Sequence, residues 1–208
     1  MAITLSVGFL IPVALEAQTA KDVFDSDVKL TWCGVDFSLA KFVGNAKEMS
    51  QERVEREVPS FNGILYTEKD KYDVRKYLNK YKVKYDLDIT NKRNDELDFS
   101  KAVITKSSGA DTLSLSDIKE LVSGYDFGDA SGVALIFIVE YFSKYKEEGL
   151  IWVTFASANS KSVIFSEKVI AKAGGFGFVN YWARTLFNTM ETVEKNWHKW
   201  KRKYASKK

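Results

Sequence analysis

Residues 132–140 read GVALIFIVE, and this stretch decides the fold. It is an almost unbroken apolar run, which is typical of a central strand covered on both faces of a sheet. Two more strands are predicted after it, over 150–156 and over 162–172. Because the connections between them are short, we expect the three strands to form an antiparallel meander.

The last element is the clearest helix. Its apolar residues recur every three or four positions, as they do on the buried face of a helix. We therefore expect a long amphipathic helix at the carboxyl end of the chain. The apolar positions are Val179, Trp182, Leu186, Met190, Val193, Trp197, Trp200 and Tyr204.

Strands are also predicted upstream of residue 132. Alternating apolar residues predict a half-buried strand over 28–37, bent at Gly34, and a second strand over 82–90. With the meander and the last helix, they predict an α/β (α+β) fold. We expect one domain over 18–208, in which helices pack on a mixed sheet with a C-terminal antiparallel meander.

Three helices are predicted between these strands. One covers 45–65 and is kinked or divided at Pro59. The second covers 70–78, and the third runs from 116 or 117 to 123. The stretch 91–111 is polar at both ends, which indicates a short helix followed by an exposed loop.

Residues 1–17, MAITLSVGFLIPVALEA, resemble an export signal. The apolar run from Ile3 to Leu15 is too short to cross a bilayer as a helix, and a small residue, Ala17, precedes an abruptly polar stretch. No Lys or Arg precedes the run, so a buried strand or helix is the alternative. We expect a cleaved signal peptide and a periplasmic or secreted protein.

Residue counts exclude several function classes. The chain has one cysteine, Cys33, and one histidine, His198, so it has no intrachain disulfide and no cysteine-based zinc site. A catalytic triad or dyad would have to use His198, which has no orienting acid beside it in the sequence. A net charge of +3 is too small to favour nucleic acid. The sequence indicates no catalytic residue, cofactor or metal ligand, and it favours a non-enzymatic protein.

A glycine-rich loop precedes the last helix. Gly174, Gly175 and Gly177 stand where free backbone N–H groups and the helix dipole can hold an anion. The loop lacks the Gly-Lys-Ser/Thr of a nucleotide P-loop and the spacing of a dinucleotide motif. The favoured alternative is a tight connection that places Phe176 and Phe178 in the core.

Three acidic residues are candidates for the same site. Asp86 and Asp88 are predicted on one face of the strand over 82–90, and Asp126 lies in the loop before the central strand. Together with the glycine loop they suggest a small-ligand receptor or a hydrolase that uses carboxylates. The alternative is that these acids lie on the solvated side of the fold.

The tail over 195–208 is basic and aromatic. It suits a protein partner, an anionic membrane surface or, less favoured, a nucleic acid backbone, and pairing of two copies is a further alternative. The competing interpretation is that the tryptophan stripe packs on its own domain while the lysines are solvated. The candidate contact residues are Trp197, Lys199, Trp200 and Arg202.

Two segments carry a resemblance to known proteins. DSDVKLTWCGVDFS (25–38) and GGFGFVNYWA (174–183) resemble the end motifs of a family of uncharacterised exported proteins from Gram-negative anaerobes. In architecture the chain is more weakly similar to the amino-terminal domain of TolB and to the curli-secretion lipoprotein, through the strand near 163–167. These resemblances imply an exported envelope protein, and they imply no activity. The missing catalytic residues and the basic, aromatic tail favour a protein that binds or assembles with a partner.

Overall fold

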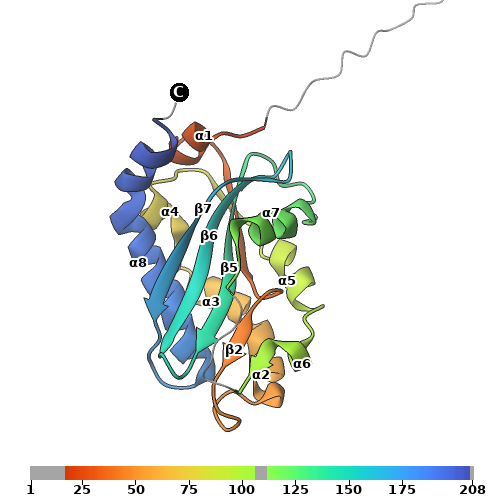
Figure 1. The fold of residues 1–208 in the computed structure, drawn as a ribbon. Helices are drawn as coiled ribbons and strands as arrows, with labels where there is room; N and C mark the ends of the chain where they lie inside the picture. The colour runs from red at the N-terminus through yellow and green to blue at the C-terminus, as the bar shows by residue number, and fades with distance from the viewer. Residues whose placement is uncertain (1–16, 106–111, 207–208) are drawn as a thin grey trace, which may run out of the picture.

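The computed structural model describes residues 17–105 and 112–206, where the fold is mixed α/β with a long C-terminal helix (Figure 1). The α/β class and the long last helix are therefore confirmed. The strands of this part of the chain form one sheet. They are β1 (Leu30–Asp36), β2 (Lys41–Val43), β3 (Val83–Tyr85), β4 (Val103–Ile104), β5 (Val133–Ser143), β6 (Glu148–Ser157) and β7 (Ser162–Lys172).

The apolar strand β5 lies at the centre of this sheet. On one side it pairs antiparallel with β6, which pairs antiparallel with β7. On the other side it pairs in parallel with β1 along its first half and with β2 at its end, so β1 and β2 lie end to end. Beyond them, β3 and β4 add further parallel pairs. The parallel half of the sheet was not predicted in detail.

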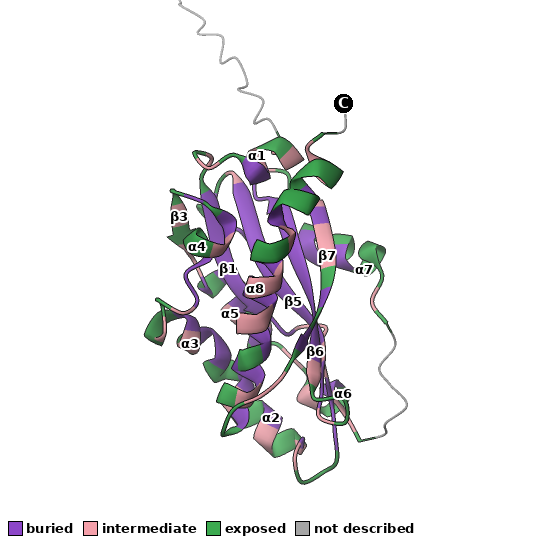
Figure 2. Ribbon diagram, turned by 90° about the vertical axis from the view of Figure 1, so that its left-hand side faces the viewer, coloured by how far each residue is buried: buried purple, intermediate pink, exposed green. Residues whose placement is uncertain are grey.

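Helices cover both faces of the sheet (Figures 1 and 2). On one face, α8 packs with α3 and α4 over the larger apolar core, and on the other, α7 and α5 close a smaller core. This double cover explains why β5 is apolar on both faces. The helices are α1 (Ala20–Phe24), α2 (Gln51–Glu57), the 3-10 turn η1 (Val58–Ser60), α3 (Phe61–Thr67), α4 (Val74–Leu78), α5 (Asp88–Asn94), α6 (Phe99–Ala102), α7 (Leu115–Ser123) and α8 (Phe178–Tyr204).

Strand β1 confirms the first predicted strand, with one correction. Gly34 bends it as expected, because its φ is +88° and the register against β5 shifts between Trp32 and Val35. The prediction that β1 is half-buried is wrong, since all of its residues are buried. The reason is that helices pack on both of its faces, so even the hydroxyl-bearing Thr31 is enclosed.

The strand predicted over 82–90 is shorter in the structure. β3 ends at Tyr85, and α5 begins at Asp88. The interpretation of Asp86 and Asp88 as two acids on one strand face is therefore wrong. The chain turns into a helix here because Thr90 and Asn94 of α5 bind backbone groups of β1.

Capping side chains explain where the helices begin. Pro59 divides the predicted helix as expected, but the first part starts at Gln51 because the Ser50 hydroxyl accepts the Arg53 N–H at 3.3 Å. Likewise α4 starts later than predicted, behind the cap Asp73. α7 starts slightly earlier, behind Ser114. In each case a side-chain oxygen satisfies a free N–H of the first turn.

The tail packs on its own domain, which corrects the interpretation of its tryptophans as an exposed surface. The exposed fractions of Trp197 and Trp200 are only 8% and 5%. The Trp197 ring lies 4.6 Å from that of Phe24, centroid to centroid. Both tryptophans continue the buried stripe of α8, so packing removes them from solvent. Lys199 and Arg202 are exposed, and a surface role for them stays a prediction.

A buried lysine fastens α1 to the domain. The Lys80 ammonium donates to the backbone carbonyl oxygens of Asp22 at 2.9 Å, Val28 at 3.3 Å and Asp25. Burial lowers the pKa of Lys80 to about 8, although the nearby Asp25 and Asp22 oppose that change. Three carbonyls from one segment therefore converge on one side chain, and the amino-terminal segment is held beside the end of α8 (Figure 1).

Two predictions concern the membrane and the amino terminus. Within 17–105 and 112–206, no helix has both the length and the apolar character needed to cross a bilayer. The predicted signal peptide lies almost entirely outside the described residues, which begin at Ala17, and so does most of the loop expected before α7.

Candidate functional site

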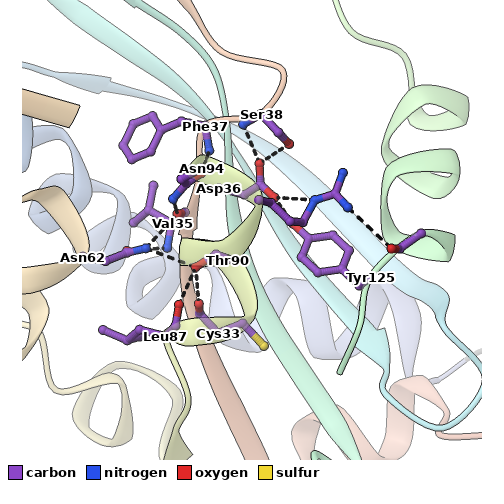
Figure 3. A network of polar contacts seen from close by, with 12 residues as sticks. Cys33, Val35, Asp36, Phe37, Ser38, Asn62, Leu87, Thr90, Asn94 and Tyr125 are labelled. Carbon is purple, nitrogen blue, oxygen red and sulfur yellow. Dashed lines mark hydrogen bonds and ion pairs between the residues drawn. The ribbon is translucent and has the colours of Figure 1, made fainter. Parts of the chain in front are cut away.

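A polar network lies at the carboxyl end of β1, where α3 and α5 meet the sheet (Figure 3). The bend at Gly34 frees backbone groups of β1 from strand pairing. The Asn62 amide accepts the Val35 N–H at 2.9 Å and donates to the Val35 carbonyl at 3.1 Å. Thr90 donates to the Cys33 carbonyl at 2.6 Å. Asn94 accepts the Phe37 N–H at 2.7 Å. Side chains of two helices thus replace the missing strand partner.

Asp36 extends this network toward α7. Its carboxylate is fully buried and accepts the Ser38 N–H at 2.7 Å and the Tyr125 hydroxyl. The Arg93 Nε lies 3.3 Å away, and the Arg93 guanidinium lies 4.8 Å from the centre of the Tyr125 ring. Burial, and then the charge of Asp36, raise the pKa of Tyr125, so the phenol remains protonated and donates.

The network stabilises the sheet, and it leaves no reactive group accessible to a ligand. A carboxylate at the carboxyl end of a parallel strand stands where α/β enzymes often place a catalytic acid. Here, however, Asp36 is enclosed, and both of its oxygens accept hydrogen bonds. Cys33, beside it, is also buried, and burial raises the pKa of its thiol, so it is not activated. We therefore assign these residues a structural role.

A second feature, which we call the loop pocket, lies at the carboxyl end of β5, before α8. Its volume is about 260 Å³. The glycine loop forms one wall, with φ values of +112° at Gly175 and +82° at Gly177 that favour glycine. The Gly174 N–H donates to the Tyr181 carbonyl at 3.0 Å, which folds the loop over the first turn of α8. The pocket is lined by Glu48, Met49, Arg53, Lys144, Gly175, Phe176, Gly177, Phe178, Tyr181 and Trp182.

Two cations from separate elements line the loop pocket. The Arg53 guanidinium, from α2, lies 5.1 Å from the centre of the Phe178 ring and forms no ion pair within the described residues. Lys144 follows β5, and its Nζ lies 3.7 Å from the centre of the Tyr181 ring. The single lining carboxylate, Glu48, is 3.9 Å from Lys144 and is already engaged by Asn45.

The start of α8 adds to this positive character. Its N-cap is Gly177, which offers no side-chain acceptor to the free N–H groups of the first turn. The positive end of the dipole of a 27-residue helix therefore borders the pocket. In addition, the Tyr181 hydroxyl oxygen is buried and has no hydrogen-bond partner within the part described. These groups together suit an anion.

The structure places the predicted site residues in different regions. Gly175 and Gly177 line the loop pocket and Gly174 hydrogen-bonds behind it, but the three acids lie elsewhere. Asp86 forms an ion pair with Lys84 at 2.7 Å, and Asp88 lies in the first turn of α5.

Asp126 and the glycine loop lie near opposite ends of β5. Asp126 precedes the start of that strand. The loop follows β7, whose last residue, Lys172, is joined through Glu148 to the last residue of β5, Ser143. The 11 residues of β5, roughly 35 Å, separate these two ends of the sheet. The prediction that acids lie beside the loop is therefore wrong.

Phe176 overturns a further expectation. It was expected in the core with Phe178, yet 95% of its surface is exposed, whereas Phe178 is buried. Three other lining residues, Arg53, Lys144 and Tyr181, were not predicted from the sequence. The position of Lys144 could have been predicted from the order of the strands. In a three-strand meander, the residue after the first strand and the residues after the third strand lie at the same edge of the sheet.

Other candidate centres lie elsewhere among the described residues. No group of histidine, cysteine and acidic side chains in this part of the chain is arranged to hold a metal ion. His198 lines a hollow of about 270 Å³ near the end of α8, far along the helix from the loop pocket. A larger hollow beside Arg93 has an arginine that is already engaged by Asp36. Its other lining residues are Leu39, Leu113, Asp117, Glu120, Leu121 and Gly124.

Comparison with known proteins yields no relative: no family model, curated protein or solved structure matches the chain. The two resemblances drawn from the sequence therefore stay predictions.

Proposed function

We propose that this protein is a non-enzymatic binding protein that holds a small anionic ligand in the loop pocket. The observation that carries the proposal is the convergence of Arg53, Lys144 and the uncapped start of α8 on one hollow. Charged donors that share an anion form the stronger class of hydrogen bonds. The volume, about 260 Å³, is near the lower end of the range for small-molecule pockets.

The same geometry favours binding over catalysis. A hydrolase needs a nucleophile or an activated water with a general base in reach. Among the side chains that line the loop pocket, the one carboxylate, Glu48, is held by Asn45 and Lys144. The acids expected to serve a hydrolase lie away from the pocket. Of the two alternatives, a small-ligand receptor and a hydrolase, we therefore retain the receptor.

Anion binding is expected to depend on both cations. In ¹H–¹⁵N spectra, inorganic phosphate should shift the amide signals of Gly175 and Gly177. Replacing Lys144 or Arg53 with glutamine should weaken binding by about 10-fold or more, since a hydrogen bond to a charged group contributes roughly 1.5–3 kcal/mol.

Lys199→Gln is the matched control, because Lys199 is exposed near the far end of α8. It should leave binding unchanged. Phosphate that fails to shift the two glycine amides, or binds equally well to all three variants, would contradict the proposal. The melting temperature of each variant shows whether the fold is intact, which matters for Arg53 because it also packs on Phe178.

We further propose that the protein acts in the periplasm or outside the cell, after removal of residues 1–17. The support is the apolar run from Ile3 to Leu15, followed by the small residue Ala17 and an abruptly polar stretch. The first helix, α1, starts within that polar stretch, at Ala20. Thr19 and Asp22 then form the capping box of α1. A cut after Ala17 would leave this capping box in place.

Cleavage is expected in the native host. The intact mass of the protein isolated from the periplasm or medium should correspond to residues 18–208. A cytosolic protein with the mass of the full chain would contradict the compartment and leave the anion site unaffected.

A further inference from the structure

Phe176 is the most exposed large apolar side chain in the described part of the chain, with 95% of its surface in solvent. It stands between Gly175 and Gly177, both of which have positive φ. These two residues hold the ring out at the mouth of the loop pocket, where it is one of the lining side chains. A ring in this position has a free face for another group.

The floor of the loop pocket is also apolar. Met49, Phe178 and Trp182 line it and belong to the large core. Trp182 is fixed in place, because its ring stacks on that of Phe142 with 4.8 Å between centroids and 3° between planes. The pocket is therefore lined both by cations, Arg53 and Lys144, and by apolar side chains.

We infer that the ligand of the loop pocket carries an aromatic ring next to its anionic group, and that Phe176 packs against this ring. The inference rests on the proposed function, since it assigns the second half of the same ligand. An inorganic anion would satisfy the cations and leave Phe176 in solvent. An aromatic anion satisfies both sides of the pocket, because rings pack face to face with an offset or edge to face.

Three probes separate the parts of this ligand: inorganic phosphate, butyl phosphate and phenyl phosphate. For the unmodified protein, phenyl phosphate should bind at least about 10-fold more tightly than inorganic phosphate, the gain expected from burying and pairing one ring. Butyl phosphate should lie between them. Calorimetric titration and the amide shifts of Gly175 and Gly177 measure all three.

Phe176→Ala should remove most of the preference for phenyl phosphate and leave the affinity for inorganic phosphate unchanged. The substitution should not disturb folding, because the ring is almost wholly exposed. Tyr66→Ala is the matched control: Tyr66 is an exposed aromatic residue on α3, outside the loop pocket, and its loss should change neither affinity.

The outcomes are distinguishable. If no probe binds, the proposed function fails and this inference fails with it. If inorganic phosphate binds as tightly as phenyl phosphate, or Phe176→Ala keeps the preference, the anion site stands and the aromatic assignment is wrong. If butyl phosphate matches phenyl phosphate, the apolar contact stands but the ligand need not be aromatic, and the inference is overturned.

Discussion

Replacing Asp36 with alanine is expected to lower the free energy of unfolding by about 2–4 kcal/mol, because hydrogen bonds to a buried charged group are lost and the Tyr125 hydroxyl is left without its acceptor. The carboxylate is wholly enclosed and accepts hydrogen bonds from Ser38 and Tyr125. Its loss leaves the Tyr125 hydroxyl without its acceptor and the Arg93 guanidinium without its ion-pair partner. Urea unfolding followed by tryptophan fluorescence measures the change.

Asp86→Ala is the matched control for this prediction. Asp86 also accepts from a cation, Lys84, at 2.7 Å, but that pair is open to solvent. Exposed pairs contribute roughly 0–1 kcal/mol, so its loss should change stability little. Equal effects of the two substitutions would show that Asp36 does not brace the sheet.

Replacing Gly34 with alanine is expected to destabilise the fold by about 2–4 kcal/mol, because strain and lost hydrogen bonds add. The φ of Gly34 is +88°, a conformation that residues with a Cβ rarely adopt. A Cβ there would lie 2.9 Å from the Asn62 Oδ1 and 3.1 Å from the Thr90 hydroxyl. Both atoms belong to the network that joins α3 and α5 to β1.

Replacing Gly63 with alanine is expected to have the opposite effect on stability. Gly63 lies within α3, and a Cβ there meets nothing within 4 Å. Alanine should stabilise this helix by roughly 0.5–1 kcal/mol, because it loses less backbone entropy on folding. Thermal and urea unfolding of both variants check the pair. A Gly34→Ala variant as stable as the parent would exclude a constrained bend in β1.

Sequence patterns predicted most elements of the fold. The apolar run of β5 and the regular spacing along α8 depend on residues close together in the chain, and both predictions hold. The burial of the tail tryptophans also followed from the regular spacing along α8. The interpretation that the tryptophan stripe packs on its own domain was therefore correct. The pattern failed over 82–90, where buried Leu87 and Ile89 continue the alternation of β3 although they belong to the start of a helix.

The site was only partly predictable. The glycine loop was visible in the sequence, and the order of the strands was enough to place Lys144 beside it. Arg53 had no such signal, because it lies about 120 residues before the loop on a helix whose position is set by packing. Phe176 was misjudged because apolar character alone does not show which of two neighbouring phenylalanines a glycine loop turns outward.

The sequence by itself determined the elements that repeat a local pattern: the central strand, the long last helix, the bend at Gly34 and the division at Pro59. Only the tertiary structure decided which distant side chains come together: Asp36 and Tyr125 share a hydrogen bond, and Arg53 and Lys144 line the same pocket. The physical reason is that periodicity shows which face of an element is buried, whereas the contacts between elements depend on how their side chains pack together.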